Sequence, residues 1–510
     1  MEDKCMKTSV FTLETVFKDA AEVPIDIDFN LPDYCPEVSR ILKCRAVPRI
    51  AAKSANGRSV TVDGGVTITL IYSDEDNMIN SYEYQYPFSK TFDSGVDLDS
   101  AVLDANVKCE YINCRAVTER KIDIHGAIGV NITARRRKNR EIISDIDDEN
   151  IELMRAAAPA TMPIGQSEKY VIVEEELEIG SSQPDIRCLV RYDADVSISE
   201  CKLLAGKAIV KGEMAVSLLY RSDDGELQTF RSNIPFSQLL EIESAGDDCI
   251  CEATANIAYL EIKPKVSSSS PTRAFSLDAK LCLRAGASCE NDVEVITDAY
   301  SRKYEASILS DSVCFDKTVY NISDTFNIRK EIDFSSGSIS AVYDIWATAN
   351  VDSVRFEGDC MMLSGTAVSN ILAREESGMP VFYEKPIPFE YSFKIPIEGK
   401  NLKADPKVSV TDVNYTISGS DKMEIGLQMA VNAAVYECAD MTIVSDIKIN
   451  ENEPLKQTRQ GAMTVYFADP GESIWEIARK YLADISEIRR LNGISEDKLQ
   501  NGQMILIPVS

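Results

Sequence analysis

The sequence predicts a mainly β protein, with three tandem antiparallel β-sandwich-like repeats followed by a small β-α-α-β module. Two observations lead to this fold class. Over roughly the first 450 residues, similar segments recur at constant spacing, and their apolar residues alternate with polar ones as in strands buried on one face. Over roughly the last 50 residues, the apolar residues recur at helical spacing instead.

A glycine and a following Pro-Phe dipeptide mark each repeat. The matched positions are Gly64 with Pro87-Phe88, Gly212 with Pro235-Phe236, and Gly365 with Pro388-Phe389. In each copy the glycine stands 23 residues before the proline, and the copies are offset by 148 and then 153 residues. Constant internal spacing in three places indicates a threefold repeat, in which we expect the third copy to pack differently because its apolar pattern is weaker.

The segment around each glycine is predicted to be a strand. In the first copy the apolar set is Val62, Gly64, Val66, Ile68, Leu70 and Tyr72. A glycine within a strand is typical of a bulge or a close backbone approach, and proline favours an edge strand. The polar segments 73–77, 222–225 and 374–378 follow these strands and predict hairpin turns.

Composition shifts suggest where the repeats end. We expect the repeats at 1–153, 165–305 and 312–448, a linker at 449–462 and the terminal module at 463–510. The stretch 154–168 is rich in alanine and proline, and 449–462 is polar and aperiodic, which is typical of linkers. A flexible linker would let the terminal module reach a partner independently of the repeats.

Charge and composition restrict the partners. The chain has 82 acidic and 54 basic residues and a formal charge of −28, so we expect neither nucleic acid nor an anionic membrane as a partner. No signal-peptide or membrane-spanning pattern is recognisable, and the 14 cysteines are scattered without a Cys-x-x-Cys pair. These features predict a cytoplasmic protein whose cysteines are reduced and that holds no metal.

The sequence offers no catalytic set. His125 is the single histidine, and strand alternation places it opposite the apolar residues around it. A Cys/His or Ser/His nucleophile would need this residue, and a zinc amidase would need two histidines. A glycosidase needs only two carboxylates and stays open as an alternative. We therefore predict a non-enzyme with no cofactor and no catalytic residues.

A basic run, Arg135 to Arg140, precedes the acidic segment 145–150. One interpretation is a solvated strand end with compensating charges. The other is a docking patch, formed by Arg135, Arg136 and Arg137, for an acidic partner or a second copy of the chain.

The terminal module carries clear helix signals. Ser473 and Glu476 form a capping-box pattern that predicts a helix to Tyr481, and Asp484 begins a second helix that ends at Asn492-Gly493. Short strands are predicted at 465–468 and 504–507.

This module resembles the LysM family. The resemblance rests on Tyr466, GESI at 471–474, WEIA at 475–478, LNG at 491–493 and GQMILIP at 502–508. It implies a shallow groove for the N-acetylated sugars of peptidoglycan or chitin. Carried over by position, the groove residues are Asp469, Gly471, Glu472, Ser473, Ile474, Asn492, Gly493 and Ile494.

The repeats resemble the SipL-type SPOCS domains of spore-coat morphogenesis proteins, on the segments at 30–42, 206–220 and 234–237. The resemblance implies a non-catalytic coat-assembly adaptor in the mother cell, at the forespore surface, that docks a coat morphogenetic ATPase of the SpoIVA type through its LysM module. Repeated domains also allow self-association through several weak contacts. The alternative is a peptidoglycan- or N-acetylglucosamine-binding wall protein, and the third hypothesis is a wall hydrolase.

Overall fold

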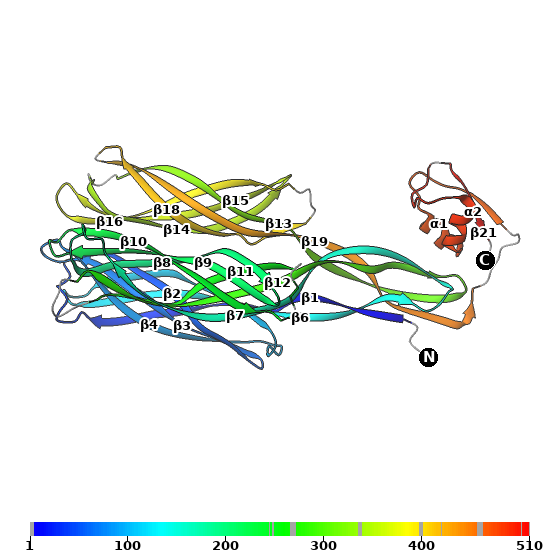
Figure 1. The fold of residues 1–510 in the computed structure, drawn as a ribbon, viewed down its shortest axis with the longest axis horizontal. Helices are drawn as coiled ribbons and strands as arrows, with labels where there is room; N and C mark the ends of the chain where they lie inside the picture. Colours follow the sequence, from blue (N-terminus) through cyan, green and yellow to red (C-terminus); the bar gives the residue numbers. More distant parts are fainter. Residues whose placement is uncertain are drawn as a thin grey trace.

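The structure is a computed structural model that describes residues 5–243, 245–246, 249–265, 272–334, 339–396, 401–419, 421–455, 463–500 and 502–508. Three β-sandwiches lie together at one end of an elongated molecule, and long strands extend from them towards a small helical module at the other end (Figure 1).

The first sandwich is built from six strands. These are β1 (Cys5–Asn30), β2 (Arg40–Asn56), β3 (Ser59–Ser73), β4 (Ile79–Asp93), β5 (Val102–Ala116) and β6 (Lys121–Ile146). They form two antiparallel sheets, ordered β1-β6-β5 and β2-β3-β4. Alternating apolar residues from both sheets meet in one core.

The other two repeats have the same topology. The second has β7 (Ile151–Glu178), β8 (Ile186–Leu204), β9 (Lys207–Ser222), β10 (Leu227–Glu241), β11 (Ile250–Pro264) and β12 (Ala274–Ser301). The third has β13 (Tyr304–Asp333), β14 (Ile339–Glu357), β15 (Cys360–Glu375), β16 (Pro380–Lys394), β17 (Leu402–Ala404), β18 (Lys407–Ile417) and β19 (Lys422–Pro454). The two sheets of the second repeat are ordered β11-β12-β7 and β10-β9-β8. Those of the third repeat are ordered β13-β19-β17 and β14-β15-β16, and β18 also pairs with β19. The predicted fold class is confirmed.

The repeated glycine and phenylalanine are partners across two strands. Gly64 of β3 lies opposite Phe88 of β4, and a Cβ at Gly64 would stand 2.2 Å from the Arg49 carbonyl oxygen and 2.5 Å from the Phe88 ring. The same contacts recur at Gly212 and Gly365. In each repeat the strand on the other side has a register shift opposite the glycine. The expected bulge and close approach are both confirmed, and the prolines lie on the edge strands β4, β10 and β16.

The third repeat differs in two places, as its weaker pattern predicts. Tyr72 and Tyr220 are buried and donate hydrogen bonds to the carbonyls of Pro36 and Pro184, whereas the corresponding residue of the third repeat is Ala373. Where the first two repeats have one strand, β5 or β11, the third has β17 and β18 separated by a break.

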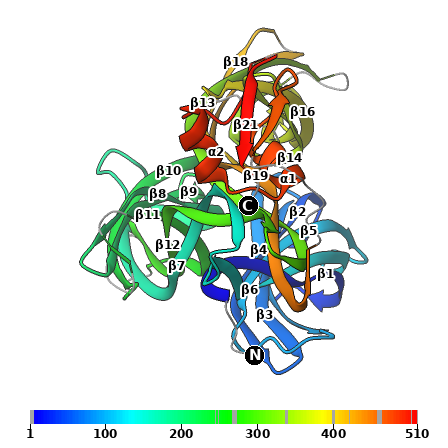
Figure 2. The same ribbon diagram turned by 90° about the vertical axis from the view of Figure 1, so that its right-hand side faces the viewer.

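The three sandwiches surround a common axis, which Figure 2 shows end on. Residues from all three meet there in one apolar cluster: Ile71, Ile79, Val190, Leu219, Trp346 and Leu372. Ile71, Leu219 and Leu372 occupy equivalent positions, on the strand face opposite each sandwich's own core. Both faces of these middle strands are therefore buried.

Charged residues at the same axis make the repeats unequal. Arg191 and Asp344 hold equivalent positions in the second and third repeats, yet they form a buried ion pair of 2.8 Å. The Arg191 guanidinium also lies 4.3 Å from the centre of the Trp346 ring. A further pair, Arg45 with Asp193 at 2.6 Å, joins the first repeat to the second.

Beyond the sandwiches, the distal parts of β1, β6, β7, β12, β13 and β19 form a stalk. Its apolar interior includes Ile142, Ala158, Ala160, Val295, Phe315 and Ile443, followed by Ile143, Ile296, Ala299, Val444 and Ile447. The Ala- and Pro-rich stretch 154–168 is therefore part of β7 and not a linker. Its alanines suit the crowded interior, and its prolines are tolerated because β7 is an edge strand.

The strands also move the repeat boundaries. The first turn between repeats is 147–150 and the second is 302–303, both at the end of the stalk. β19 continues to Pro454, so the first part of the expected linker is strand, because 449–450 pair with β13. The remainder, 456–462, lies outside the described residues.

Six of the cysteines are paired, which corrects the expectation of reduced, scattered cysteines. The disulfides join Cys201 to Cys251, Cys249 to Cys289 and Cys314 to Cys438. Sequence spacing did not indicate these pairs because each joins residues brought together only by strand and sheet packing.

Replacing Gly212 by alanine should destabilise the second repeat by about 2 kcal/mol or more, because the new Cβ would overlap the Ser197 carbonyl and the Phe236 ring. Urea denaturation of the full chain measures the effect. Gly286→Ala is the matched control, since nothing lies within 4 Å of a Cβ at that position. Equal stability of the two variants would contradict the role of the glycine.

Removing one partner of the buried axial pair, as in Arg191→Met, should cost about 3–5 kcal/mol because Asp344 stays buried and unpaired. The double variant Arg191→Met with Asp344→Leu should recover most of that loss. Thermal unfolding of the single and double variants tests this. If the double variant is as unstable as Arg191→Met, packing on Trp346 and not charge pairing is the dominant contribution.

Candidate ligand and partner site at the end of the stalk

The terminal module is a two-stranded sheet covered by two helices. Its elements are β20 (Met463–Phe467), α1 (Ile474–Tyr481), α2 (Ile485–Asn492) and β21 (Met504–Pro508). The Ser473 hydroxyl accepts from the Glu476 amide at 3.1 Å, and the Glu476 carboxylate accepts from the Ser473 amide at 2.8 Å, so the predicted capping box is present. Asp484 caps α2, and neither described helix has the length and apolarity needed to cross a membrane.

One side of the predicted groove, the loop before α1, pairs with the chain that follows the loop after α2. The loop 469–474 pairs with the segment 497–499, because the Ile474 amide donates to the Asp497 carbonyl at 2.9 Å and the Leu499 amide donates to the Glu472 carbonyl at 3.0 Å. The loop after α2 begins at Gly493, whose φ of 61° requires the left-handed region that glycine adopts freely.

Several of the predicted groove side chains have structural roles. Ile474 is only 1% exposed and belongs to the core of the module. The Asn492 amide group donates to the carbonyls of Ile488 and Leu506 at 2.8 Å and accepts from the Leu506 amide at 2.7 Å, which joins α2 to β21. Glu472 accepts from the Tyr466 hydroxyl and the Asp469 amide, and its hydrogen bond raises the pKa of Tyr466.

The other groove positions are more accessible. Asp469, Gly471 and Gly493 are exposed, whereas Ser473 and Ile494 are half-buried. Next to this loop, the outer face of the sheet exposes four large apolar side chains: Met463 (51%), Val465 (53%), Phe467 (63%) and Met504 (54%). β20 alternation and the opposite position of Met504 in β21 place all four on one face.

A tyrosine of the stalk completes the core of the module. Tyr300, near the end of β12, is 4% exposed and packs with Ile474, Ile477 and Ala483. Its hydroxyl donates to the Ala483 carbonyl at 2.6 Å, and its ring lies edge-on to Trp475 with 5.1 Å between ring centres. Burial is the main cause that raises the pKa of Tyr300, and the nearby Glu152 raises it further. The tyrosine therefore stays a neutral hydrogen-bond donor.

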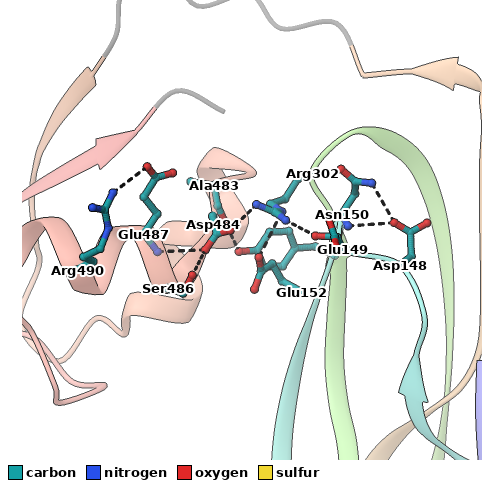
Figure 3. Close-up of polar contacts among 11 residues, drawn as sticks. Asp148, Glu149, Asn150, Glu152, Arg302, Ala483, Asp484, Ser486, Glu487 and Arg490 are labelled. Atoms are coloured by element: carbon teal, nitrogen blue, oxygen red, sulfur yellow. Dashed lines mark hydrogen bonds and ion pairs between the residues drawn. The ribbon is translucent and has the colours of Figure 1, made fainter.

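Arg302 ties the same face of the module to two turns of the stalk (Figure 3). Its guanidinium donates to the Asp484 carboxylate at 2.5 Å and to the Glu149 carbonyl, and it lies 3.3 Å from the Glu152 carboxylate. Burial raises the pKa of Asp484. Hydrogen bonds from Ser486 and the Glu487 amide, together with the charge of Arg302, outweigh this effect and hold that pKa below its usual value. Asp484 thus caps α2 and binds the stalk at once.

Asp298 makes the third contact. Its carboxylate accepts from the Trp475 indole N–H at 2.9 Å and pairs with Arg479 of α1. The contacts of Asp298, Tyr300 and Arg302 all fall on α1 and the α1–α2 connection. We call this contact the stalk–module junction. The module is held by the repeats, which contradicts the expectation that it reaches partners independently.

The predicted basic patch is divided between two strand faces. Arg135 and Arg137 are exposed, whereas Arg136 is half-buried and its guanidinium donates to the Asp97 carbonyl. Lys138 pairs with Glu14 of β1 at 2.8 Å. Because side chains alternate along β6, the basic surface is smaller than the basic sequence segment 135–140 suggests.

His125 is exposed, as its position in the alternation predicts. Its two ring nitrogens lie 3.1 Å from Asp26 and from Asp123. These three residues are close enough to share a cation, but Asp123 is also paired with Arg115 at 2.7 Å, which competes with a metal ion. A second group within the described residues, Cys314, Cys438 and Asp440, has both sulfurs in a disulfide.

Family comparisons agree with this architecture. Residues 37–119 and 185–265 match the model described as SipL, SPOCS domain, and residues 469–508 match the LysM domain. The chain carries SipL-type SPOCS domains and a LysM domain. No curated protein and no solved structure gives a significant match. The SPOCS matches lie in the first two repeats, and the third shares their strand order.

These domain types define a coarse function. SPOCS and LysM domains are of non-catalytic binding types, and their combination places the chain among sporulation-related proteins with a peptidoglycan-binding type of module. The LysM match covers residues 469–508, which include both helices and β21.

Tyr300→Ala should release the LysM module from the stalk, because it removes a buried ring and the hydrogen bond to Ala483. We expect amide exchange in α1 and α2 to become at least about tenfold faster while the sandwiches are unchanged. Tyr300→Phe keeps the ring and loses only the hydrogen bond, so it should weaken the contact between module and stalk by only about 1 kcal/mol. The exposed Tyr415→Ala is the control, and unchanged exchange in Tyr300→Ala would contradict the junction.

Proposed function

We propose that the protein is a non-catalytic spore-envelope assembly adaptor that docks a coat morphogenetic ATPase of the SpoIVA type through its LysM domain. Its place would be the mother-cell cytoplasm at the forespore surface. The combination of SPOCS domains with a LysM domain supports the sporulation context of this proposal.

The observation that carries the proposal is the exposed apolar face of the LysM sheet. Met463, Val465, Phe467 and Met504 gather on one face, and Phe467 lies two residues from the groove loop. A contiguous exposed apolar surface is typical of a protein interface. The junction contacts the helical side of the module, so the apolar face of the sheet stays exposed at the end of the stalk.

Within the groove, we propose contacts from Asp469, Gly471 and Gly493, which are exposed, and from Ile494. Glu472, Ser473, Ile474 and Asn492 act by shaping these loops, since their side chains are engaged inside the module. On the repeats, Arg135 and Arg137 offer a secondary contact for an acidic partner or a second copy, with Arg136 contributing less.

Glycan binding is the second candidate, because the LysM domain is a peptidoglycan-binding type of module and the predicted groove loops carry two exposed glycines, Gly471 and Gly493. It predicts binding to peptidoglycan, whereas the adaptor proposal predicts binding to the coat ATPase. A wall hydrolase is the third candidate, and release of muropeptides by the full chain would support it.

The test uses the full chain, because Tyr300 belongs to the core of the LysM module. Purified coat ATPase and purified sacculi are each offered to the wild-type chain and to Ile494→Asp. We expect the ATPase to be retained by the wild type and its affinity to fall at least about tenfold in the variant, because a charge is placed in the apolar part of the groove.

Ile172→Asp is the matched control, since Ile172 is 71% exposed on β7, away from the module. It should bind as the wild type does. Phe467→Ser tests the apolar face without touching the groove. Retention of sacculi and not of the ATPase would replace the adaptor proposal with the glycan-binding one.

A further inference from the structure

Two cysteines and two aspartates lie together on the antiparallel ribbon formed by β13 and β19. In the register of the two strands, Cys314 lies opposite Asp440, and Asp316 lies opposite Cys438. Residues paired across a ribbon, and residues two apart in one strand, share a face, so all four side chains lie on one face. It is the face opposite Phe315, which belongs to the stalk interior.

The four side chains are spaced as the ligands of one metal ion. The two sulfurs and a carboxylate oxygen of Asp440 lie within 4.8 Å of one another. The Asp440 Oδ1 is 3.9 Å from the Cys438 sulfur, and the Asp316 Oδ1 is 3.6 Å from the Cys314 sulfur. In a tetrahedral zinc site, a sulfur ligand and an oxygen ligand are about 3.6 Å apart. Each aspartate therefore already stands at the distance from its sulfur that shared binding of Zn²⁺ requires.

The two carboxylates are available for such an ion. Both are exposed, and within the described part of the chain neither Asp316 nor Asp440 forms an ion pair. We propose that Cys314, Cys438 and Asp440 bind Zn²⁺ when the two cysteines are reduced, with Asp316 in the fourth position. Thiolate and carboxylate are both ligands that zinc accepts. The proposal does not depend on the function assigned to the LysM domain.

The disulfide between Cys314 and Cys438 is the oxidised form of the same site. A dithiol reductant supplies two electrons, so the S–S bond breaks, two thiols form and the reductant itself becomes a disulfide. Zn²⁺ then replaces the two thiol protons, which pass to water, and forms two Zn–S bonds while it stays divalent. With 5.9 Å between the two Cα atoms, rotation about the Cα–Cβ bonds can separate the sulfurs to about 3.8 Å while the strands stay in place.

The site lies where the third ribbon leaves its sandwich. The Cys438 amide donates to the Asn401 carbonyl at 3.3 Å, directly before β17 begins, and Phe315 on the other face already packs in the stalk. Bound zinc would join β13 to β19 at this point. Because the ion binds the folded chain, it should also stabilise that chain by mass action.

The test titrates the full chain with Co²⁺, which takes the same ligands as Zn²⁺ and absorbs light. The chain is first reduced with a phosphine, which is then removed without oxygen. We expect one Co²⁺ to bind with a thiolate-to-cobalt charge-transfer absorption that Zn²⁺ abolishes by displacement. The chain with Cys314 and Cys438 in a disulfide should lack this absorption. Absence of the absorption in the reduced chain would overturn the proposal.

Two variants assign the binding to this site. Cys314→Ser should lose the charge-transfer absorption, because one of the two thiolates is gone. Asp440→Asn should bind Zn²⁺ at least about tenfold more weakly, because a neutral amide replaces a charged ligand. Asp440 is exposed, so this variant keeps the fold even if Cys314→Ser does not.

Asp359→Asn is the matched control. Its Oδ1 also lies close to a cysteine sulfur, 3.5 Å from that of Cys360, but Cys360 is a free cysteine outside the proposed site. This variant should bind both ions as the wild type does. Wild-type zinc affinity in Asp440→Asn, or full absorption in Cys314→Ser, would place the metal elsewhere on the chain and refute the site.

Discussion

Packing of three long antiparallel ribbons against one another is the constraint on which the rest of the molecule depends. Each ribbon begins inside a sandwich and continues into the stalk, where Ile142, Val295 and Phe315 come from different repeats. Burial of this interior fixes the register of the ribbons, because a one-residue slip would turn its apolar residues outwards. The ribbons in turn carry the repeat-connecting turns to the end of the stalk, where the LysM domain sits.

Local sequence patterns were sufficient for much of this fold. Alternation around Gly64, Gly212 and Gly365, with their constant distance to Pro-Phe, predicted the strands, the edges and the bulges, because a close approach of Phe88 to a backbone needs a residue without a side chain. The capping residues Ser473 and Asp484 located both helices for a similar reason, since they satisfy groups within one turn of themselves.

Contacts between distant segments were not accessible in this way. The alanines of 154–168 look like a linker in sequence, and only the crowded stalk explains them. Tyr300 and Arg302 lie at a turn between repeats with no motif of their own, yet they hold the LysM domain. The resemblance predicted eight groove residues without distinguishing their roles. The structure separates those that form the loops, such as Asn492, from those that are exposed, such as Gly493.

The charges at the axis show an advantage of joining the three sandwiches in one chain. Lys43, Arg191 and Asp344 occupy one equivalent position, and Arg45, Asp193 and Trp346 occupy another. A homotrimer would place three identical charges around each of these points, whereas repeats fused in one chain can place a cation beside an anion. Such pairs require that the repeats differ in sequence at these positions. The chain therefore has the form of a trimer whose three subunits can be told apart. A single LysM domain can then be bound at one defined position among three related ones.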